Sequence, residues 1–533
     1  MDFLQKAVAK QASDLKRIAN TYAQHGASLY KKSLAAWFAP AYSADEDISD
    51  NLPLLRSRSR DLYMGTPIAT GALKTIRTSV IGSGLRLKSL LVPNAKTLKI
   101  TEEQAQDTAW RIEKEFELWA SYCDSQGLLS WGELQSLALL SALMSGDCFC
   151  LLTNERDSHT PYAMKLRLLE GDYVCDPVPY DGAKNIVQGV EVSENGKLMA
   201  YWVCNYHPNS FIRSAEAGAY KWTRVEPFGR RTGRRKILHI RADYERPAQR
   251  RGLPLLAPVI ESLKQLTRYT DAELMAAVIG SMFTVFIKTE TPMAPIGQAP
   301  IIPPTVKPLP EQDYKLGAGT VLGLGRNESI EVANPSRPNS QFMPFVEAMC
   351  SQIGAALELP PELLLKTFNA SYSASRGAIM EAWRMFKMRR DWLVHSFCQP
   401  IYETFLAEAV ALERVKCPGF FDDPLLRKLW CNATWTGPAQ GQLNPLDEAN
   451  AAAIRVENGF STRAREAAEI SGMDYEALSL VRQREEALLP LPRIMDPGAT
   501  ANYTEENGER ATPVSYPINS QKGANNQGME GEK

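Results

Sequence analysis

Seven of the twenty residues from Thr291 to Pro310 are proline, and this segment constrains the fold more than any other part of the chain. Proline lacks a backbone N–H and fixes φ, so the stretch can form neither a helix nor a central strand. Apolar residues recur at helical spacing on both sides of it, over 254–281 and 342–357. The sequence therefore predicts two helices joined by a long non-helical insertion, which includes the turn-rich segment Gly317–Gly325.

Before the proline cluster, the pattern changes from helical to extended. Helical spacing of apolar residues covers stretches at about 1–40, 51–80, 101–122 and 130–145. Thr101 followed by Gln104 has the spacing of a capping box. From 148 to 245 the apolar period becomes two, and Asn195-Gly196 between two such runs indicates a hairpin. Helices combined with a mostly β region predict an α+β fold.

After residue 357 the pattern is helical again. We expect a loop and then a long helix over about 375–413, which Pro400 should kink. Further helices are expected over 445–490. From about Pro497 the chain contains few apolar residues, so it cannot bury enough surface to offset its chain entropy and is predicted to be disordered.

The charge balance argues against one large class of function. The 533 residues include 60 Lys and Arg and 61 Asp and Glu, which gives a net charge of −1. A protein that wraps nucleic acid usually carries a large basic excess. Any contact with DNA is therefore expected to be local, transient or weak.

Cysteine usage and hydropathy argue against secretion and membrane insertion. The nine cysteines contain no CxxC pair, which favours reduced thiols in a cytoplasmic setting. Cys148 and Cys150 alternate in a predicted strand and should pack on one face. The first ten residues lack the apolar core of a signal peptide. The most membrane-like run, Leu274–Ile287, has 14 residues and is too short to span a bilayer.

No motif for catalysis, cofactor binding or metal binding stands out. The chain has no GxxxxGK[ST] loop, no GxSxG elbow and no HExxH helix, and its five histidines are scattered. We therefore predict no catalytic residues, no cofactor and no metal. A site assembled from distant residues stays open as an alternative.

One basic group has two interpretations. Five cations crowd a glycine-containing, hairpin-like loop, namely Arg230, Arg231, Arg234, Arg235 and Lys236. The loop could contact a phosphate or a partner, or it could be an ordinary solvated loop. The sequence favours neither.

An ordered series of short motifs resembles the lambda-like family of phage portal proteins. The series consists of Arg56–Leu62, Val80–Leu85, Gly146–Phe149, Leu168–Asp172, Ala200–Pro208, Ile237–Ile240, Arg246–Pro258, Tyr372–Arg376, Asn458–Thr462 and Gly472–Tyr475. The Arg-Gly-x-Pro turn within Arg246–Pro258 leads directly into the expected helix. Tyr372–Arg376 departs from the family's Tyr-Ser-Ser-x-Arg pattern, because Ala374 replaces the second serine. One such motif is weak, but the series covers about 420 residues in order.

The resemblance implies a portal fold, α+β in class, with a mixed wing, a long-helix stem, a small proline-rich clip, a kinked long helix and a helical crown. By order along the chain, the regions would be 1–250 for the wing, 251–281 for the stem helix, 282–341 for the clip, 342–358 for the second stem helix, 359–374 for the tunnel loop, 375–444 for the kinked helix and wing return, 445–496 for the crown, and 497–533 for a disordered tail.

The resemblance also implies two groups of important residues. Candidate channel residues in the tunnel loop are Lys366, Thr367, Phe368 and Asn369. The turn between wing and stem would contain Arg250, Arg251, Gly252 and Pro254. For the tunnel loop the alternative is that 363–365 anchor a loop that never meets DNA.

The implied function is a ring of about twelve subunits at one capsid vertex, through which double-stranded DNA is packaged and ejected. The implied partners are the terminase large subunit, the major capsid and scaffold proteins, and head-completion or tail proteins, with no membrane. Such a protein would occur in the virion and, during assembly, in the host cytoplasm. A near-zero net charge suits a channel along which DNA slides, because each fixed phosphate contact adds a barrier. The alternatives are a mobile-element nuclease or hydrolase, and another ring-forming head–tail adaptor.

Overall fold

The computed structural model describes residues 31–34, 36–37, 40–93, 98–179, 185–210, 220–241, 243–281, 285–289, 328–332, 340–368, 371–441 and 444–488. The proline cluster, the glycine-rich segment 317–325 and the segment from 497 lie outside these residues, as does most of the helix expected over 1–40. The chain divides into two units, Met1–Tyr475 and Glu476–Lys533, and each is described by itself.

Among the described residues, five helices precede strand β2, and three of them begin with a capping box. The helices are α2 (Ala44–Ser49), α3 (Leu52–Gly65), α4 (Pro67–Val80), α5 (Glu102–Ala120) and α6 (Trp131–Ser145). The box predicted at the start of α5 is confirmed, because the Gln104 N–H donates to Thr101 Oγ1 at 3.3 Å and the Thr101 N–H donates to Gln104 Oε1 at 3.1 Å. Ser43 and Ser130 cap α2 and α6 in the same way.

The predicted β region forms two antiparallel sheets. One has the order β3-β2-β8, with β2 (Asp147–Asn154), β3 (Met164–Glu170) and β8 (Ile237–Arg241). The other has the order β4-β5-β6-β7, with strands Ile186–Val187, Val190–Val192, Leu198–Cys204 and Trp222–Val225. The hairpin predicted at Asn195-Gly196 joins β5 to β6, and Gly196 has the positive φ of 73° that its turn requires.

Alternation along β2 separates two cores. Cys148 and Cys150 face the main core, as the period of two predicted, whereas Phe149 between them faces a smaller core. The smaller core is shared by the two sheets and contains Leu169, Val190, Tyr201, Val203 and Ile237. The two sheets are therefore packed together by the outer face of β2.

The main core packs together segments that lie far apart in the sequence. An aromatic group at its centre joins α5 and α6 to α11 (Gln399–Ala411), and its members are Phe116, Trp119, Trp131, Tyr402 and Phe405. Strand β1 (Arg86–Ser89) pairs with β11 (Ala433–Thr436), which follows the short helix α12 (Pro424–Trp430). The segment after residue 372 thus returns to the N-terminal helices.

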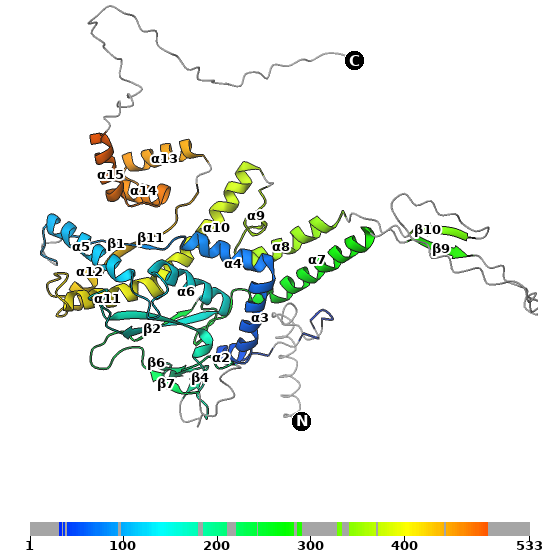
Figure 1. Ribbon diagram of the computed structural model, residues 1–533, viewed down its shortest axis with the longest axis horizontal. Helices are drawn as coiled ribbons and strands as arrows, with labels where there is room; N and C mark the ends of the chain where they lie inside the picture. Colours follow the sequence, from blue (N-terminus) through cyan, green and yellow to red (C-terminus); the bar gives the residue numbers. More distant parts are fainter. Residues whose placement is uncertain are drawn as a thin grey trace, which may run out of the picture. The chain divides into compact units, whose positions relative to one another are not determined.

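Two long helices leave and re-enter this core (Figure 1). The first is α7 (Ile260–Ser281), preceded by a 3-10 turn, and the second is α8 (Phe342–Ala356). The helix expected from 254 starts at 260, because Pro254 and Pro258 keep the chain in a turn until then. Between the helices, β9 (Val285–Thr289) pairs antiparallel with β10 (Glu328–Val332).

The long helix expected over 375–413 contains a π-helical turn just before Pro400, the position at which a kink was expected. It consists of α10 (Tyr372–Leu393), a π-helical turn over Val394–Cys398 and then α11. Pro400 has no N–H to donate to the preceding turn, and the wider π turn accommodates that loss. The short helix α9 (Pro361–Leu365) precedes α10.

The crown region expected over 445–496 is helical as far as it is described. Its helices are α13 (Pro445–Glu457), α14 (Arg463–Ser471) and α15 (Tyr475–Leu488). Within the first unit, Arg455 and Glu466 join α13 to α14 by two hydrogen bonds, of 2.9 and 2.6 Å. None of the described helices has both the length and the apolar character of a membrane span.

Candidate functional site

The turn between β8 and α7, residues 250–254, is pressed against the corner between α6 and β2. We call it the junction turn. A Cβ atom built on Gly252 would lie 2.0 Å from the Gly146 carbonyl oxygen, and one on Gly146 would lie 2.4 Å from the Gly252 oxygen. The Leu255 N–H donates to the Leu143 carbonyl at 2.8 Å. The two backbones therefore touch directly, and only glycine fits on either side.

Arg251 is buried in the junction turn, with 1% of its surface exposed. Its guanidinium makes five hydrogen bonds: two to the Asp147 carboxylate at 2.7 and 3.0 Å, and one each to the carbonyls of Gly171 (2.6 Å), Val174 (2.7 Å) and Gln188 (2.6 Å). Asp147 begins β2, Gly171 follows the end of β3, Val174 forms a bridge with Val203 of β6, and Gln188 lies between β4 and β5. Arg251 thus ties both sheets to the start of α7.

Asp147 is the centre of this network and is fully buried. Besides Arg251, its oxygens accept hydrogen bonds from Arg56 Nη2 at 2.5 Å, from His239 Nε2 at 3.1 Å and from the Gly252 N–H at 3.1 Å. Burial opposes its ionised form, but the charges of Arg251 and Arg56 outweigh that effect and hold the pKa of Asp147 well below its usual range. Asp147 is therefore a buried carboxylate between two buried arginines.

His239 completes the network on β8. Its ring stacks on Phe149, with centroids 4.2 Å apart, and its Nε2 reaches Asp147. Burial lowers the pKa of His239 to about 4 although Asp147 favours the charged form. The ring is thus neutral at pH 7, with the Nε2–H donating to Asp147.

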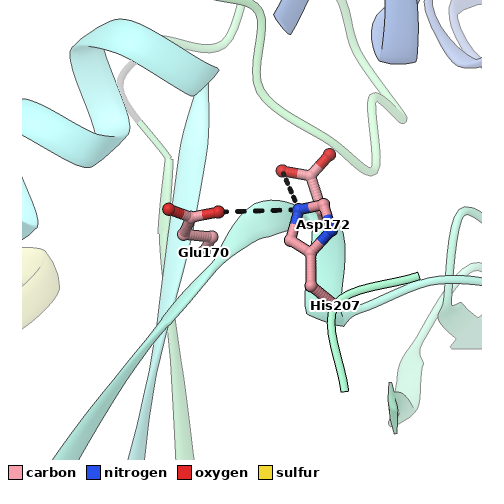
Figure 2. A group of neighbouring side chains, drawn as sticks. All are labelled: Glu170, Asp172 and His207. Carbon is pink, nitrogen blue, oxygen red and sulfur yellow. Dashed lines mark ion pairs between the residues drawn. The ribbon is translucent and has the colours of Figure 1, made fainter. Parts of the chain in front are cut away.

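Next to this network lie Glu170, Asp172 and His207, whose side chains converge in Figure 2. His207 Nε2 lies 3.6 Å from a Glu170 oxygen and 4.0 Å from an Asp172 oxygen, a spacing at which three ligands could hold a metal ion. The Arg60 guanidinium already lies there, ion-paired with both carboxylates. The group is therefore a continuation of the arginine–carboxylate network, with Arg60 as its cation.

All five charged or imidazole side chains of the central network come from motifs that carry the family resemblance. Arg56, Asp147, Asp172, His239 and Arg251 lie in separate motifs of the sequence and meet in one place. The sequence predicts a role for Arg251 and Gly252 but not for their partners in this network. Because the network satisfies its own charges, its arrangement suits structural locking of the junction turn and offers no free nucleophile or general base.

The other two junction residues have different surroundings. Arg250 points away from Asp147 and pairs with Asp45 at 2.9 Å and with the Asn185 side chain at 2.7 Å. Pro254, the last residue of the turn, is buried. Arg250 therefore holds α2 against the four-stranded sheet rather than joining the buried network.

The tunnel-loop candidates lie at the end of α9. Leu364 of α9 is buried in the main core, whereas Lys366, Thr367 and Phe368 are exposed, and Phe368 is 53% exposed. Lys366 adopts a left-handed conformation, with φ of 57°, that ends α9. Asn369 lies outside the described residues. The structure thus combines an anchored helix with an exposed tip, and both interpretations of the loop remain compatible with it.

The basic loop is a hairpin turn whose cations are mostly engaged. Arg230 pairs with Glu226 at 2.5 Å, Arg234 pairs with Glu408 of α11 at 3.2 Å, and Arg235 lies 4.6 Å from the centre of the Phe228 ring. Arg231 and Lys236 are exposed and have no ion-pair partner among the described residues. The loop borders a cavity of about 330 Å³ against α11. Three of the five cations of the loop therefore already interact with side chains of the same chain.

The comparisons with known proteins agree on one family. The model of the lambda family of phage portal proteins matches residues 30–390. A probable portal protein of Halomonas phage phiHAP-1 is 22% identical over 429 residues, covering 78% of this chain and 77% of that protein.

Two of the similar solved structures are necks of gene transfer agent particles. The neck of a native particle with C12 symmetry is 14% identical, with a TM-score of 0.42, and covers 78% of this chain and 92% of that one. The neck of an empty particle with C6 symmetry is 13% identical, with a TM-score of 0.42, and covers 83% and 98%. At these TM-scores the family assignment rests on the sequence match.

Proposed function

The chain belongs to the lambda family of phage portal proteins, and from this we propose that about twelve copies form a ring-shaped DNA channel at one capsid vertex. The single observation that carries the proposal is the family match, which spans residues 30–390 and so includes the junction turn, α7, α8 and most of α10. The role is structural, without catalysis. Energy for packaging would come from a separate motor.

The regions of the ring follow from the order of the elements. Residues 1–250 would form the wing, α7 and α8 the stem, 282–341 the clip and 445–496 the crown. Helices α7 and α8 support this assignment, because they are long, adjacent and continuous with the main core. The proline-rich clip would dock the terminase large subunit and later the head-completion or tail proteins, since proline lowers the entropy lost when a docking surface becomes ordered.

Native mass spectrometry with negative-stain images of the purified full chain tests the ring. Twelve copies of 59.2 kDa give a species of about 0.7 MDa, with a central hole in the images. Rings of eleven or thirteen also fit, because closure outside a capsid can vary. A monomer or dimer that persists after addition of the matching capsid and scaffold proteins contradicts the proposal.

A further inference from the structure

Helices α7 and α8 form an antiparallel pair whose register is set by aromatic contacts. The start of α7, through Leu263, and the end of α8, through Ile353, both enter the main core. Farther out, the Tyr269 ring lies 5.7 Å from that of Phe342 and 4.7 Å from that of Phe345. The two helices are antiparallel and have the same rise per residue. A residue a given number of positions before Tyr269 on α7 therefore lies level with the residue the same number of positions after Phe342–Phe345 on α8.

This register places three exposed charges at one level. Glu347 of α8 lies level with the α7 turn from Lys264 to Arg268, and these two cations share one face because they are four residues apart. All three side chains are exposed, and none has an ion-pair partner among the described residues. Glu347 is the only ionisable side chain at the exposed positions between 343 and 356. At this level α7 therefore presents two cations and α8 presents a carboxylate, while the exposed acidic residues of α7, Glu261 and Asp271, lie about one turn away on either side.

Apolar side chains lie exposed on the same two helices. Leu274 and Met275 of α7 are 63% and 58% exposed, and Met343 and Phe345 of α8 are 57% and 46% exposed. Apolar surface beside unpaired charge is typical of protein–protein contacts. The short side chains Ala348, Ser351 and Ala355 on exposed positions of α8 also let a neighbouring helix approach closely.

We propose that the Lys264–Arg268 face of α7 docks on the Glu347 face of α8 in a second copy of this chain. The inference rests on the ring proposed above and assigns it a residue-level contact. A contact between two different faces is heterologous, so a chain of copies always leaves one α7 face and one α8 face free at its ends. These two faces meet only when the rotation between copies closes a ring. Rotation about an axis along the helix pair keeps the three charges level from copy to copy. The occupant is a second copy because the chain itself carries the complementary charge at that level.

Two charge-reversal variants test the contact. Lys264→Glu with Arg268→Glu makes the α7 face acidic, and Glu347→Lys makes the α8 face basic. Each variant alone places like charges across every interface and should give about tenfold fewer rings than the wild type at moderate salt. Circular dichroism should show both variants folded, since the three side chains are exposed and unpaired within the chain. Lys114→Glu, at an exposed position on α5, is the control and should leave ring yield unchanged.

Mixing the two variants gives the sharpest result. In a ring that alternates them, each acidic α7 face meets a basic α8 face, and each wild-type α7 face meets a wild-type α8 face. The equimolar mixture should therefore regain near-wild-type ring yield, and mass spectrometry with one variant size-tagged should show equal numbers of both in each ring.

The outcomes separate this inference from the ring proposal. Normal rings from either variant alone, or no rescue by the mixture while the wild type forms rings, would overturn the contact and leave the ring intact. Failure of the wild type to form rings with its capsid and scaffold proteins would overturn the ring proposal.

Discussion

Gly252 has no room for a methyl group, because its α-carbon faces the backbone of Gly146. Gly252→Ala should therefore destabilise the fold by about 3 kcal/mol or more, since the added Cβ would meet backbone that cannot rotate away. The measurement is the urea midpoint of unfolding. Gly377→Ala in α10 is the matched control, because nothing lies within 4 Å of its added Cβ. That change should be neutral or stabilise by up to about 1 kcal/mol. Equal midpoints for both variants would refute the close contact.

Arg251 and its neighbour Arg250 should differ sharply in their tolerance of lysine. Arg251→Lys keeps the charge but loses most of the five hydrogen bonds, so we expect a loss of about 3 kcal/mol in the free energy of unfolding. Arg250→Lys lies nearer the surface and should cost about 1 kcal/mol or less. Chemical denaturation of the two variants side by side measures the difference. If Arg251→Lys left the free energy of unfolding unchanged, the hydrogen bonds of Arg251 would not be what stabilises the junction turn.

His239 makes the stability of the protein depend on pH. Burial lowers its pKa from 6.5 to about 4, so the unfolded chain binds more protons than the folded one between these values. Its contribution is present above pH 6.5 and is lost as the pH falls toward 4. Asp147 acts in the same direction at lower pH, because its pKa is also lowered by folding.

The prediction is that His239→Gln flattens this dependence. The wild type should lose stability between pH 6.5 and 4.5 with a slope approaching about 1.4 kcal/mol per pH unit from this one group, and the variant should lose less. Urea midpoints across that range measure both slopes. Parallel curves for the two proteins would mean that His239 titrates normally.

The sequence could not predict this network from local pattern. Arg56 and Asp147 are 91 positions apart, and Asp147 and Arg251 are 104 apart, so no helical or strand period relates them. What the sequence did provide was a set of motifs in order. Their meeting point depends on how the two sheets pack, which is a tertiary property.

At the scale of elements, α9 has a buried residue, Leu364, and is followed four positions later by an exposed one, Phe368. Leu364→Ala should cost about 2–4 kcal/mol in stability, because the side chain is buried in the main core. Phe368→Ala should cost less than about 1 kcal/mol, because the ring is 53% exposed. If the loop faces the channel, Phe368→Ala rings should assemble normally and package DNA at an altered rate. Unchanged packaging would favour the alternative that the loop only anchors α9.

Element boundaries were predictable where a local signal defines them. The capping box at Thr101 fixed the start of α5, and Asn195-Gly196 fixed the hairpin between β5 and β6. Apolar periodicity predicts the start of α7 six residues too early, because it does not take into account that Pro254 and Pro258 keep the chain in a turn. The form of the break before Pro400, a π turn, also depends on packing rather than on the proline alone.

At the scale of the whole molecule, the segment beyond 497 should be dispensable for assembly. Its composition predicts disorder. Deleting 500–533 should leave the number of subunits per ring unchanged in native mass spectrometry. Loss of rings after the deletion would show that this segment takes part in subunit contacts.

The direct contact between the Gly146 and Gly252 backbones also has a mechanical consequence. No long side chain lies between them to bend under load, and the Arg251 fork holds the joint from the side. A force along α7 would therefore be transmitted to the start of β2 with little deformation at this contact. We expect such a joint to pass a displacement of α7 on to both sheets, because Arg251 binds the start of β2 and the turn after β4 at the same time.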